Sequence, residues 1–189
     1  MEENQERPKN IIINSNILFS SLIKEEGFTR ATLLFLKEDA SLKFLIPKKV
    51  IEEFGMHLGE ISRKAGLSIR DIRFGFDKLL ENVERINEND TKEEIKQGLK
   101  YVKDESDSPF VGIALKYKPS YILTYNKKHY KTEELKILNI FVITPKEALD
   151  LIGIENFELQ TKEKRKRNLF SYLTKFKIFM KNKKEESRE

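Results

Sequence analysis

Two short apolar runs that stop abruptly in small polar residues constrain the fold of this chain most strongly. The run Ile11-Ile12-Ile13 ends in Asn14-Ser15-Asn16, and Tyr121-Ile122-Leu123 ends in Thr124-Tyr125-Asn126. A buried strand of a parallel sheet is a near-continuous apolar run, and in open α/β sheets ligands bind at the carboxyl ends of the strands. We therefore expect both polar clusters at one edge of a central sheet.

Helical periodicity alternates with further short apolar segments along the chain. Apolar residues recur at helical spacing in residues 16–23, 29–36, 47–62, 69–80 and 144–152, and residues 42–46 and 83–86 are predicted as strands or extended segments. This order predicts an α/β fold with a central parallel sheet flanked by helices.

Several helix starts carry capping or first-turn signals. Such signals place a side-chain oxygen before the helix, a carboxylate three residues later, or a proline in the first turn. They occur at Asn16, at Pro47, at Thr91 with Glu94 before a helix predicted to reach Val102, at Ser108 with Pro109, and at Thr144 with Pro145 and Glu147. In the helix over 47–62, Glu53 is expected nearer the buried face than Glu52.

Length and composition indicate one folded core. The chain has 189 residues without cysteine or tryptophan, which gives no sign of disulfides or thiolate metal ligands and makes a reducing cytoplasm the expected compartment. The first ten residues are polar, and no apolar run approaches the roughly 18 residues of a membrane span. We therefore expect a soluble protein, with a membrane partner unlikely.

The excess positive charge is concentrated at the carboxyl end. The whole chain carries 36 Lys and Arg against 31 Asp and Glu, and residues 160–189 alone hold 11 basic and 4 acidic residues. We predict a polar extension over residues 1–10, a domain over 11–153 and a basic tail over 154–189. Apolar residues at helical spacing predict that the tail forms a basic amphipathic helix. It can pack on its own domain, dock on a partner or a second copy, lie on a membrane, or contact RNA.

Acidic residues add to the expected polar edge of the sheet. Asp104 and Asp107 precede the helix that opens at Ser108, a position that acids favour without any further function. Together with Asn14, Glu53 and Asn126 they form an oxygen-rich set that suits Mg²⁺ or Mn²⁺. Such an ion supports phosphodiester hydrolysis without a covalent intermediate.

Histidine chemistry has little support from the sequence. The chain has two histidines, His57 on a predicted helix and His129 after the pair Lys127-Lys128 in a predicted loop. Three clustered nitrogen or sulfur ligands would be typical of a zinc site.

The order of these motifs resembles the PIN domain ribonucleases, a family that includes toxins of the VapC type and enzymes of ribosomal RNA processing. The resemblance covers roughly residues 10–153. Four segments carry it: Ile11 to Leu18, Pro47 to Phe54, Asp104 to Leu115, and Leu123 to Asn126 with Lys127, Lys128 and His129. It implies a three-layer fold, a Mg²⁺ or Mn²⁺ cofactor, and dimerisation as a family expectation.

The resemblance also implies roles for individual residues. Glu53, Asp104 and Asp107 are the expected catalytic residues, and with Asn14 and Asn126 they are the expected metal ligands. Ser15, Asn16 and Thr124 are expected to support the site. Independently of the resemblance, positive charge makes Lys127, Lys128, Lys164, Arg165, Lys166 and Arg167 the expected nucleic-acid contacts. The family's first and last acidic positions hold Asn14 and Asn126 here, and each amide keeps a carbonyl ligand but loses a negative charge.

Three functions are consistent with this sequence. The first is a metal-dependent endoribonuclease, with activity weakened or lost through the two amides. The second is an inactive RNA-binding or assembly module with the same fold. The third is the toxin half of a toxin–antitoxin pair, in which a small antitoxin would cover the acidic cleft.

Overall fold

Five short strands form one fully parallel sheet in the order β3-β2-β1-β4-β5. The computed structural model describes residues 9–24 and 27–151 of the chain. The strands are β1 (Lys9–Ile13), β2 (Leu42–Pro47), β3 (Val83–Ile86), β4 (Ser120–Leu123) and β5 (Ile140–Ile143). The sequence prediction of a central parallel sheet flanked by helices is confirmed.

Eight α-helices and four 3₁₀ turns connect the strands within the described residues. The helices are α1 (Ser15–Ile23), α2 (Phe28–Leu36), α3 (Lys49–Ala65), α4 (Ile69–Leu79), α5 (Lys92–Gly98), α6 (Ser108–Lys116), α7 (Thr132–Ile137) and α8 (Pro145–Leu151). The 3₁₀ turns are η1 (Glu88–Thr91), η2 (Leu99–Tyr101), η3 (Glu105–Asp107) and η4 (Lys127–His129).

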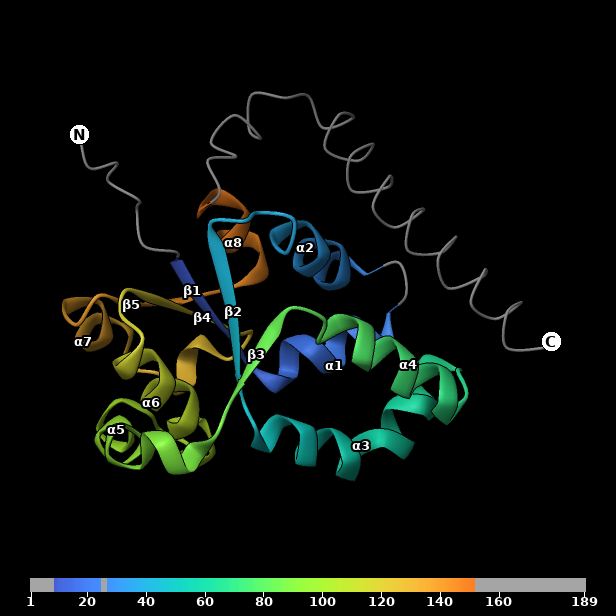
Figure 1. Cartoon of the computed structure of the whole chain (residues 1–189), viewed down its shortest axis with the longest axis horizontal. Helices are drawn as coiled ribbons and strands as arrows, with labels where there is room; N and C mark the ends of the chain where they lie inside the picture. Colours follow the sequence, from blue (N-terminus) through green and yellow to red (C-terminus); the bar gives the residue numbers. More distant parts are fainter. Residues whose placement is uncertain (1–8, 25–26, 152–189) are drawn as a thin grey trace.

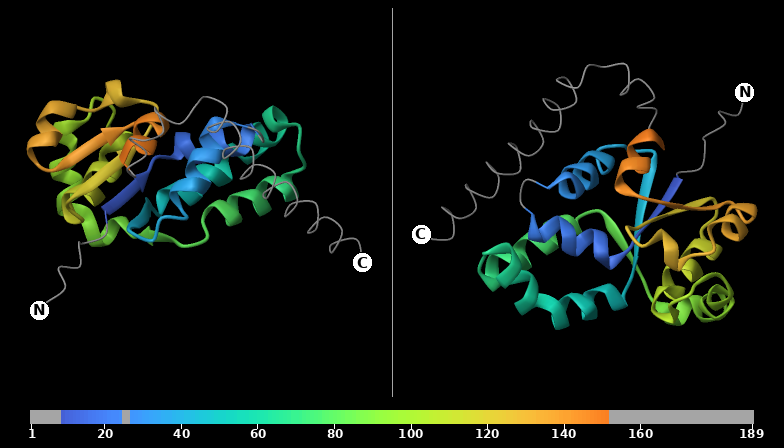
Figure 2. Two further views of the ribbon diagram at one scale, coloured as in Figure 1. Left: turned by 90° about the horizontal axis from the view of Figure 1, so that it is seen from above. Right: turned by 180° about the vertical axis from the view of Figure 1, so that it is seen from behind.

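The helices cover both faces of the sheet. In Figure 1, α5, α6 and α7 lie on one side and α1, α2 and α8 on the other, while α3 and α4 form a helical pair that Figure 2 shows projecting from the sheet. The residues Ile11, Ile12 and Ile13 of β1 are almost completely buried because β1 is the central strand and lies under both layers. This burial explains why residues 11–13 of β1 form an uninterrupted apolar run.

Local signals explain most of the helix boundaries. Gly66 adopts a left-handed conformation with φ 66° and ends α3, and the Ser68 hydroxyl caps α4 by accepting a hydrogen bond from the Asp71 N–H. The predicted capping box at α8 is confirmed: Thr144 N–H donates to Glu147 Oε2 over 2.7 Å, and Glu147 N–H donates to Thr144 Oγ1 over 3.3 Å. The prediction that Glu53 is less exposed than Glu52 is also confirmed.

Some local predictions are wrong. Asn14, rather than Asn16, caps α1, because its side-chain oxygen accepts the Asn16 N–H. Pro47 ends β2 instead of opening α3, at a strand end where its missing N–H breaks no ladder. The Thr91 side chain makes no cap hydrogen bond and donates instead to the Glu88 carbonyl, and α5 ends at Gly98.

Two further boundaries differ from the sequence prediction. Asp107 rather than Ser108 occupies the N-cap position of α6, with Pro109 in the first turn as expected. The strand β5 and the helix α7 before it were not predicted. Strand β1 begins at Lys9, two residues before the predicted domain start. The predicted basic tail over 154–189 lies outside the described residues.

None of the helices within residues 9–24 and 27–151 combines the length and hydropathy that crossing a bilayer requires.

Candidate metal centre

Asp107 lies at the centre of a hydrogen-bonded cluster at the carboxyl edge of the sheet. It is 7% exposed, ends the turn η3 and occupies the N-cap position of α6. Its Oδ1 accepts hydrogen bonds from Asn14 Nδ2 and from the Tyr130 hydroxyl, each over 3.0 Å. Its Oδ2 lies 3.0 Å from His129 Nδ1. Both carboxylate oxygens are therefore held in a fixed orientation.

Asn14 joins β1 to this cluster. It is 3% exposed, and its Nδ2 also donates to the Tyr130 hydroxyl over 3.0 Å. Its Oδ1 accepts the Asn16 N–H over 3.1 Å at the start of α1. The carbonyl oxygen is thus used as a helix cap, while the amide nitrogen is aimed at the carboxylate of Asp107.

Tyr130 is buried between these two polar groups. Burial raises the pKa of its hydroxyl far above the ordinary value, and the negative charge of Asp107 adds to this rise. The hydroxyl consequently keeps its proton and acts as a permanent donor to Asp107.

Asp104 provides a second carboxylate at the edge of the same cluster. It is exposed, and hydrogen bonding to Ser106, first to its side chain and then to its backbone N–H, holds the pKa of Asp104 below its usual value. Ligand atoms of Asp104, Asp107 and His129 all lie within 4.8 Å of one another. Two carboxylates and an imidazole at this spacing fit a divalent cation of the Mn²⁺ or Mg²⁺ type, with the nitrogen favouring Mn²⁺.

The remaining predicted ligands lie beside this group. Glu53 on α3 forms a 3.4 Å ion pair with Lys49, and Lys49 Nζ also donates to the Ser106 carbonyl next to Asp104. Lys49 therefore links Glu53 to the turn η3. Glu53 does not belong to the group of side chains whose ligand atoms converge within the described residues.

Asn126 is connected to the cluster through its backbone. Its N–H donates to Thr124 Oγ1 over 3.0 Å, and its carbonyl accepts the His129 N–H over 2.9 Å as the turn η4 begins. Among the described residues, no hydrogen bond of the Asn126 side chain is observed, so its amide is not committed to another partner.

The predicted supporting residues hold the ends of β1 and β4 together. Asn16 Nδ2 donates to Thr124 Oγ1 over 3.0 Å, and Ser15 Oγ lies 3.5 Å from Asn14 Oδ1. Thr124 is completely buried. These contacts fix the spacing of the two strand ends that carry Asn14 and Asn126.

The predicted nucleic-acid contacts fall into three groups. Lys127 forms a 2.7 Å ion pair with Glu147, whereas Lys128 is exposed. The four tail residues Lys164, Arg165, Lys166 and Arg167 lie outside the described residues.

Sequence reasoning missed His129 and Tyr130 as parts of the cluster. The turn η4 directly after the last polar motif brings His129 back toward Asp107. An antiparallel bridge between Val102 and Tyr130 fixes the position of Tyr130, and the Lys103 N–H donates to the His129 carbonyl over 2.7 Å. The segment at Val102 and Lys103 therefore meets the segment at His129 and Tyr130 through backbone contacts. Because the two segments are far apart in sequence, no rule based on residue spacing predicts these contacts.

The fold and this cluster define a parallel α/β protein with two carboxylates and an imidazole, a set that can hold a metal ion, at the carboxyl edge of its sheet. A family model described as PIN domain matches residues 12–131, which is well over half of the chain. The chain belongs to the PIN domain family, whose members are generally nucleases and typically use divalent metal ions. Comparison with curated proteins and with solved structures gave no match.

Proposed function

We propose that this protein is a metal-dependent endoribonuclease in which Asp104, Asp107 and His129 hold a Mn²⁺ or Mg²⁺ ion. The observation that carries the proposal is the convergence of their ligand atoms within 4.8 Å at the sheet edge of a PIN domain. Glu53, Asn14 and Asn126 border this group; the Asn14 oxygen caps α1 and Glu53 pairs with Lys49, while the side chain of Asn126 makes no hydrogen bond within the described residues.

The surrounding residues prepare Asp107 for this role. Asn14 and Tyr130 occupy Oδ1 with two hydrogen bonds, which leaves Oδ2, now beside His129, as the oxygen that can turn toward a cation. A divalent cation bound there supplies a Lewis acid that neutralises phosphate charge and lowers the pKa of water. Lys49, beside Asp104 and Glu53, adds a positive charge that attracts the phosphate.

Cleavage of RNA in the presence of Mn²⁺ tests this proposal. Wild-type protein should cut a labelled single-stranded RNA, and Asp107→Asn should lower the rate by at least 100-fold, on the order expected for loss of a preorganised charged group. Asp150→Asn, a change on the exposed surface of α8, is the matched control. Equal cleavage by wild type and Asp107→Asn would exclude this site.

The amides Asn14 and Asn126 favour a second function, an RNA-binding or assembly module without cleavage. Each replaces the acid of the family pattern and removes negative charge from the cation's surroundings. Salt-sensitive RNA binding without any cleavage in Mn²⁺ would support this alternative. Conversion of both amides to Asp should then restore turnover if the rest of the site is intact.

The finer assignments stay predictions. The first is that the protein belongs either to the toxin type, with a small antitoxin partner, or to the ribosomal RNA processing type. The second is that the protein forms a dimer. Copurification of the chain with the product of a neighbouring short reading frame would support the toxin assignment.

A further inference from the structure

A hollow of about 460 Å³ lies between α1 and α3. Its size falls within the roughly 300–1,000 Å³ of small-ligand pockets. Asn16, Phe19 and Lys24 line it from the side of α1, and His57, Glu60 and Lys64 line it from α3. We call this hollow the α1–α3 pocket.

Asn16 links the α1–α3 pocket to the candidate metal centre through hydrogen bonds. Asn16 lines the pocket, and its Nδ2 donates to Thr124 Oγ1 over 3.0 Å at the end of β4. The backbone N–H of Asn16 bonds Asn14 Oδ1, and the Nδ2 of Asn14 bonds Asp107. Asn16 and the N-cap residue Asn14 thus connect the pocket to Asp107 through hydrogen bonds. A ligand that reaches both sites would therefore be a strand of linked units.

One wall of the α1–α3 pocket is aromatic and open to solvent. The rings of Phe19 and His57 lie 5.9 Å apart between centroids at an angle of 53°. The side chain of His57 is 51% exposed, so its ring is accessible to a ligand. Aromatic rings at the surface of a groove are typical platforms for the bases of single-stranded nucleic acid.

The charge of the lining suits a phosphodiester strand. Lys64 pairs with Glu60 over 2.6 Å, and Glu60 also lies 3.4 Å from His57. Two lysines and one glutamate leave the lining with a net charge of +1 when His57 is neutral. Lys24 is exposed at the end of α1, where its ammonium can meet a phosphate.

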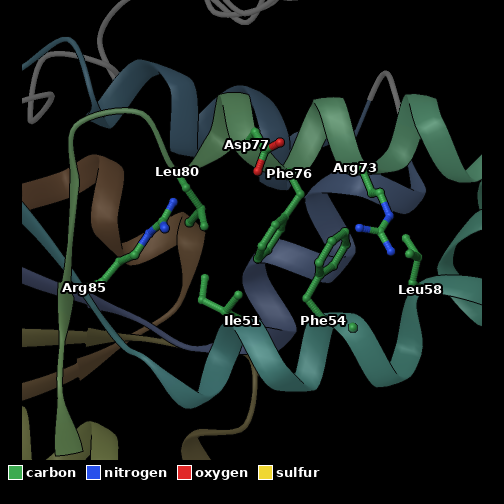
Figure 3. Close-up of a pocket in the computed structure, with 9 residues that line it drawn as sticks. Ile51, Phe54, Leu58, Arg73, Phe76, Asp77, Leu80 and Arg85 are labelled. Carbon is green, nitrogen blue, oxygen red and sulfur yellow. The ribbon is translucent and has the colours of Figure 1, made fainter.

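A second hollow, between α3 and α4, lacks these properties. It measures about 220 Å³, and Figure 3 shows Arg73 and Arg85 at its ends with Phe54 and Phe76 between them. The two phenyl rings stack on each other at 3.7 Å, so their faces already have a partner. Unlike the α1–α3 pocket, it is lined neither by Asn16 nor by any other residue of the predicted site.

We propose that the α1–α3 pocket binds a base of single-stranded RNA, stacked against His57 and Phe19, while the adjacent phosphates lead past Asn16 to the metal centre. The inference rests on the proposed function in taking RNA as the ligand. It adds a binding site that selects unpaired over paired RNA, because a base stacked on His57 is not paired within a duplex.

Fluorescence anisotropy of a labelled single-stranded oligoribonucleotide, measured on the full chain in EDTA, tests the proposal without cleavage. His57→Ala should weaken binding by about 5-fold or more, the lower end of the loss of one stacking ring. His57→Phe, which keeps a ring, should retain most of the affinity. Met56→Ala, at a neighbouring residue that is 75% exposed and does not line the pocket, should bind as wild type.

An oligonucleotide of the same length without bases supplies the second arm. The affinity of the protein for this oligonucleotide should not change on His57→Ala, because only a base can stack on the His57 ring. Equal binding by wild type and His57→Ala, or an equal loss for the oligonucleotide without bases, would overturn the proposal.

Cleavage in Mn²⁺ separates this inference from the proposed function. If RNA binding depends on His57 but the protein never cleaves RNA, the result would support the α1–α3 pocket as a binding site and would exclude the ribonuclease function. If the protein cleaves RNA but replacement of His57 does not change binding, the result would support the ribonuclease function and would exclude the proposed binding of a base in the pocket.

Discussion

At position 14, one side-chain amide donates hydrogen bonds both to Asp107 Oδ1 and to the Tyr130 hydroxyl. A carboxylate at this position would place a negative charge against Asp107 and remove the donor. In EDTA, Asn14→Asp should therefore lower the free energy of unfolding by about 1.5–3 kcal/mol, the value of a hydrogen bond to a charged group. Added Mn²⁺ should reduce this loss, because the extra carboxylate should make the folded variant bind the cation more tightly than wild type, and tighter binding to the folded state gives more stabilisation.

Urea unfolding in EDTA and in Mn²⁺ measures both effects. Asn126→Asp is the matched control, because no hydrogen bond of its side chain is observed in the described residues, and it should cost little stability in EDTA. Full stability of Asn14→Asp without metal would show that the Asn14 amide does not stabilise the cluster through its two donated hydrogen bonds.

The Tyr130 hydroxyl is the second donor to Asp107. Tyr130→Phe removes only that oxygen, and because the bond is buried and made to a carboxylate, it should cost about 1.5–3 kcal/mol of unfolding free energy. Tyr121→Phe, a partly buried tyrosine stacked on Phe141, should cost less than about 0.5 kcal/mol. Chemical unfolding at neutral pH compares them, and similar losses in the two variants would argue against the hydrogen bond.

The element that presents Asp107 depends on a close helix contact. A Cβ added at Gly112 in α6 would lie 2.6 Å from Ile95 Cγ1 and 2.7 Å from Ile95 N in α5. Gly112→Ala must push the helices apart and should cost about 1–3 kcal/mol. It should also weaken Mn²⁺ binding, measured by calorimetry, because Asp107 lies at the start of the displaced helix.

Gly59 provides the control for this change. A Cβ at Gly59, within α3, meets nothing within 4 Å, so Gly59→Ala should raise stability by about 0.5–1 kcal/mol. If the two alanine variants were equally stable, the tight contact between α5 and α6 would be refuted.

Helix α8 depends on its capping box and on the charge of Glu147. Burial by itself would raise the pKa of Glu147, but hydrogen bonds from Lys127 and Thr144 outweigh it and hold the pKa below 4.5. Glu147→Ala should cost about 1 kcal/mol at neutral pH. Glu94→Ala, at the equivalent place of a capping box that does not form, should cost less than about 0.5 kcal/mol.

The pH dependence of the Glu147 contribution has a defined sign. A carboxyl group with a lowered folded-state pKa binds fewer protons in the folded than in the unfolded protein, so it stabilises the fold above the unfolded pKa. The difference between wild type and Glu147→Ala should shrink as the pH falls below 4.5 toward the lowered pKa. Thermal unfolding across pH 3 to 7 measures it, and a constant difference would contradict the ionic part of the cap.

The elements show what the sequence can and cannot predict. The strands β1 and β4 were predictable because buried parallel strands leave continuous apolar runs. The run Ile140-Phe141-Val142-Ile143, which forms β5, has the same apolar pattern. Asn14 and Asn16 are equally good caps by residue type, and only the paired position of β1 decides between them. The place of His129 in the cluster could not be predicted, because it depends on the η4 turn and on the tertiary contact of the bridge at Tyr130.

At the scale of the whole molecule, charge distinguishes residues 1–159 from the carboxyl end. Residues 160–189 carry 11 basic and 4 acidic residues, whereas the chain as a whole has a net charge of only +5. Residues 1–159 therefore carry a small net negative charge. Non-specific attraction to an RNA backbone should consequently depend on the carboxyl end, while the metal centre and the α1–α3 pocket act on the strand that is already bound.

Replacing Lys164, Arg165, Lys166 and Arg167 by Gln in the full chain tests this division. For single strands, the logarithm of the binding constant falls with the logarithm of salt concentration by about 0.7 per phosphate contact. The slope should therefore become shallower by up to about 2.8 if all four residues contact phosphates. Anisotropy titrations of a single-stranded oligoribonucleotide from low to moderate salt measure this slope.

The matched control carries the same change in charge on the body, at exposed lysines of α5, η2 and α7: Lys92, Lys96, Lys100 and Lys136. Because these residues lie on the helices away from the α1–α3 pocket, their replacement by Gln should leave the slope close to that of wild type. An equal change of slope in the two variants would mean that RNA responds only to net charge. In that case the carboxyl end would have no specific part in binding.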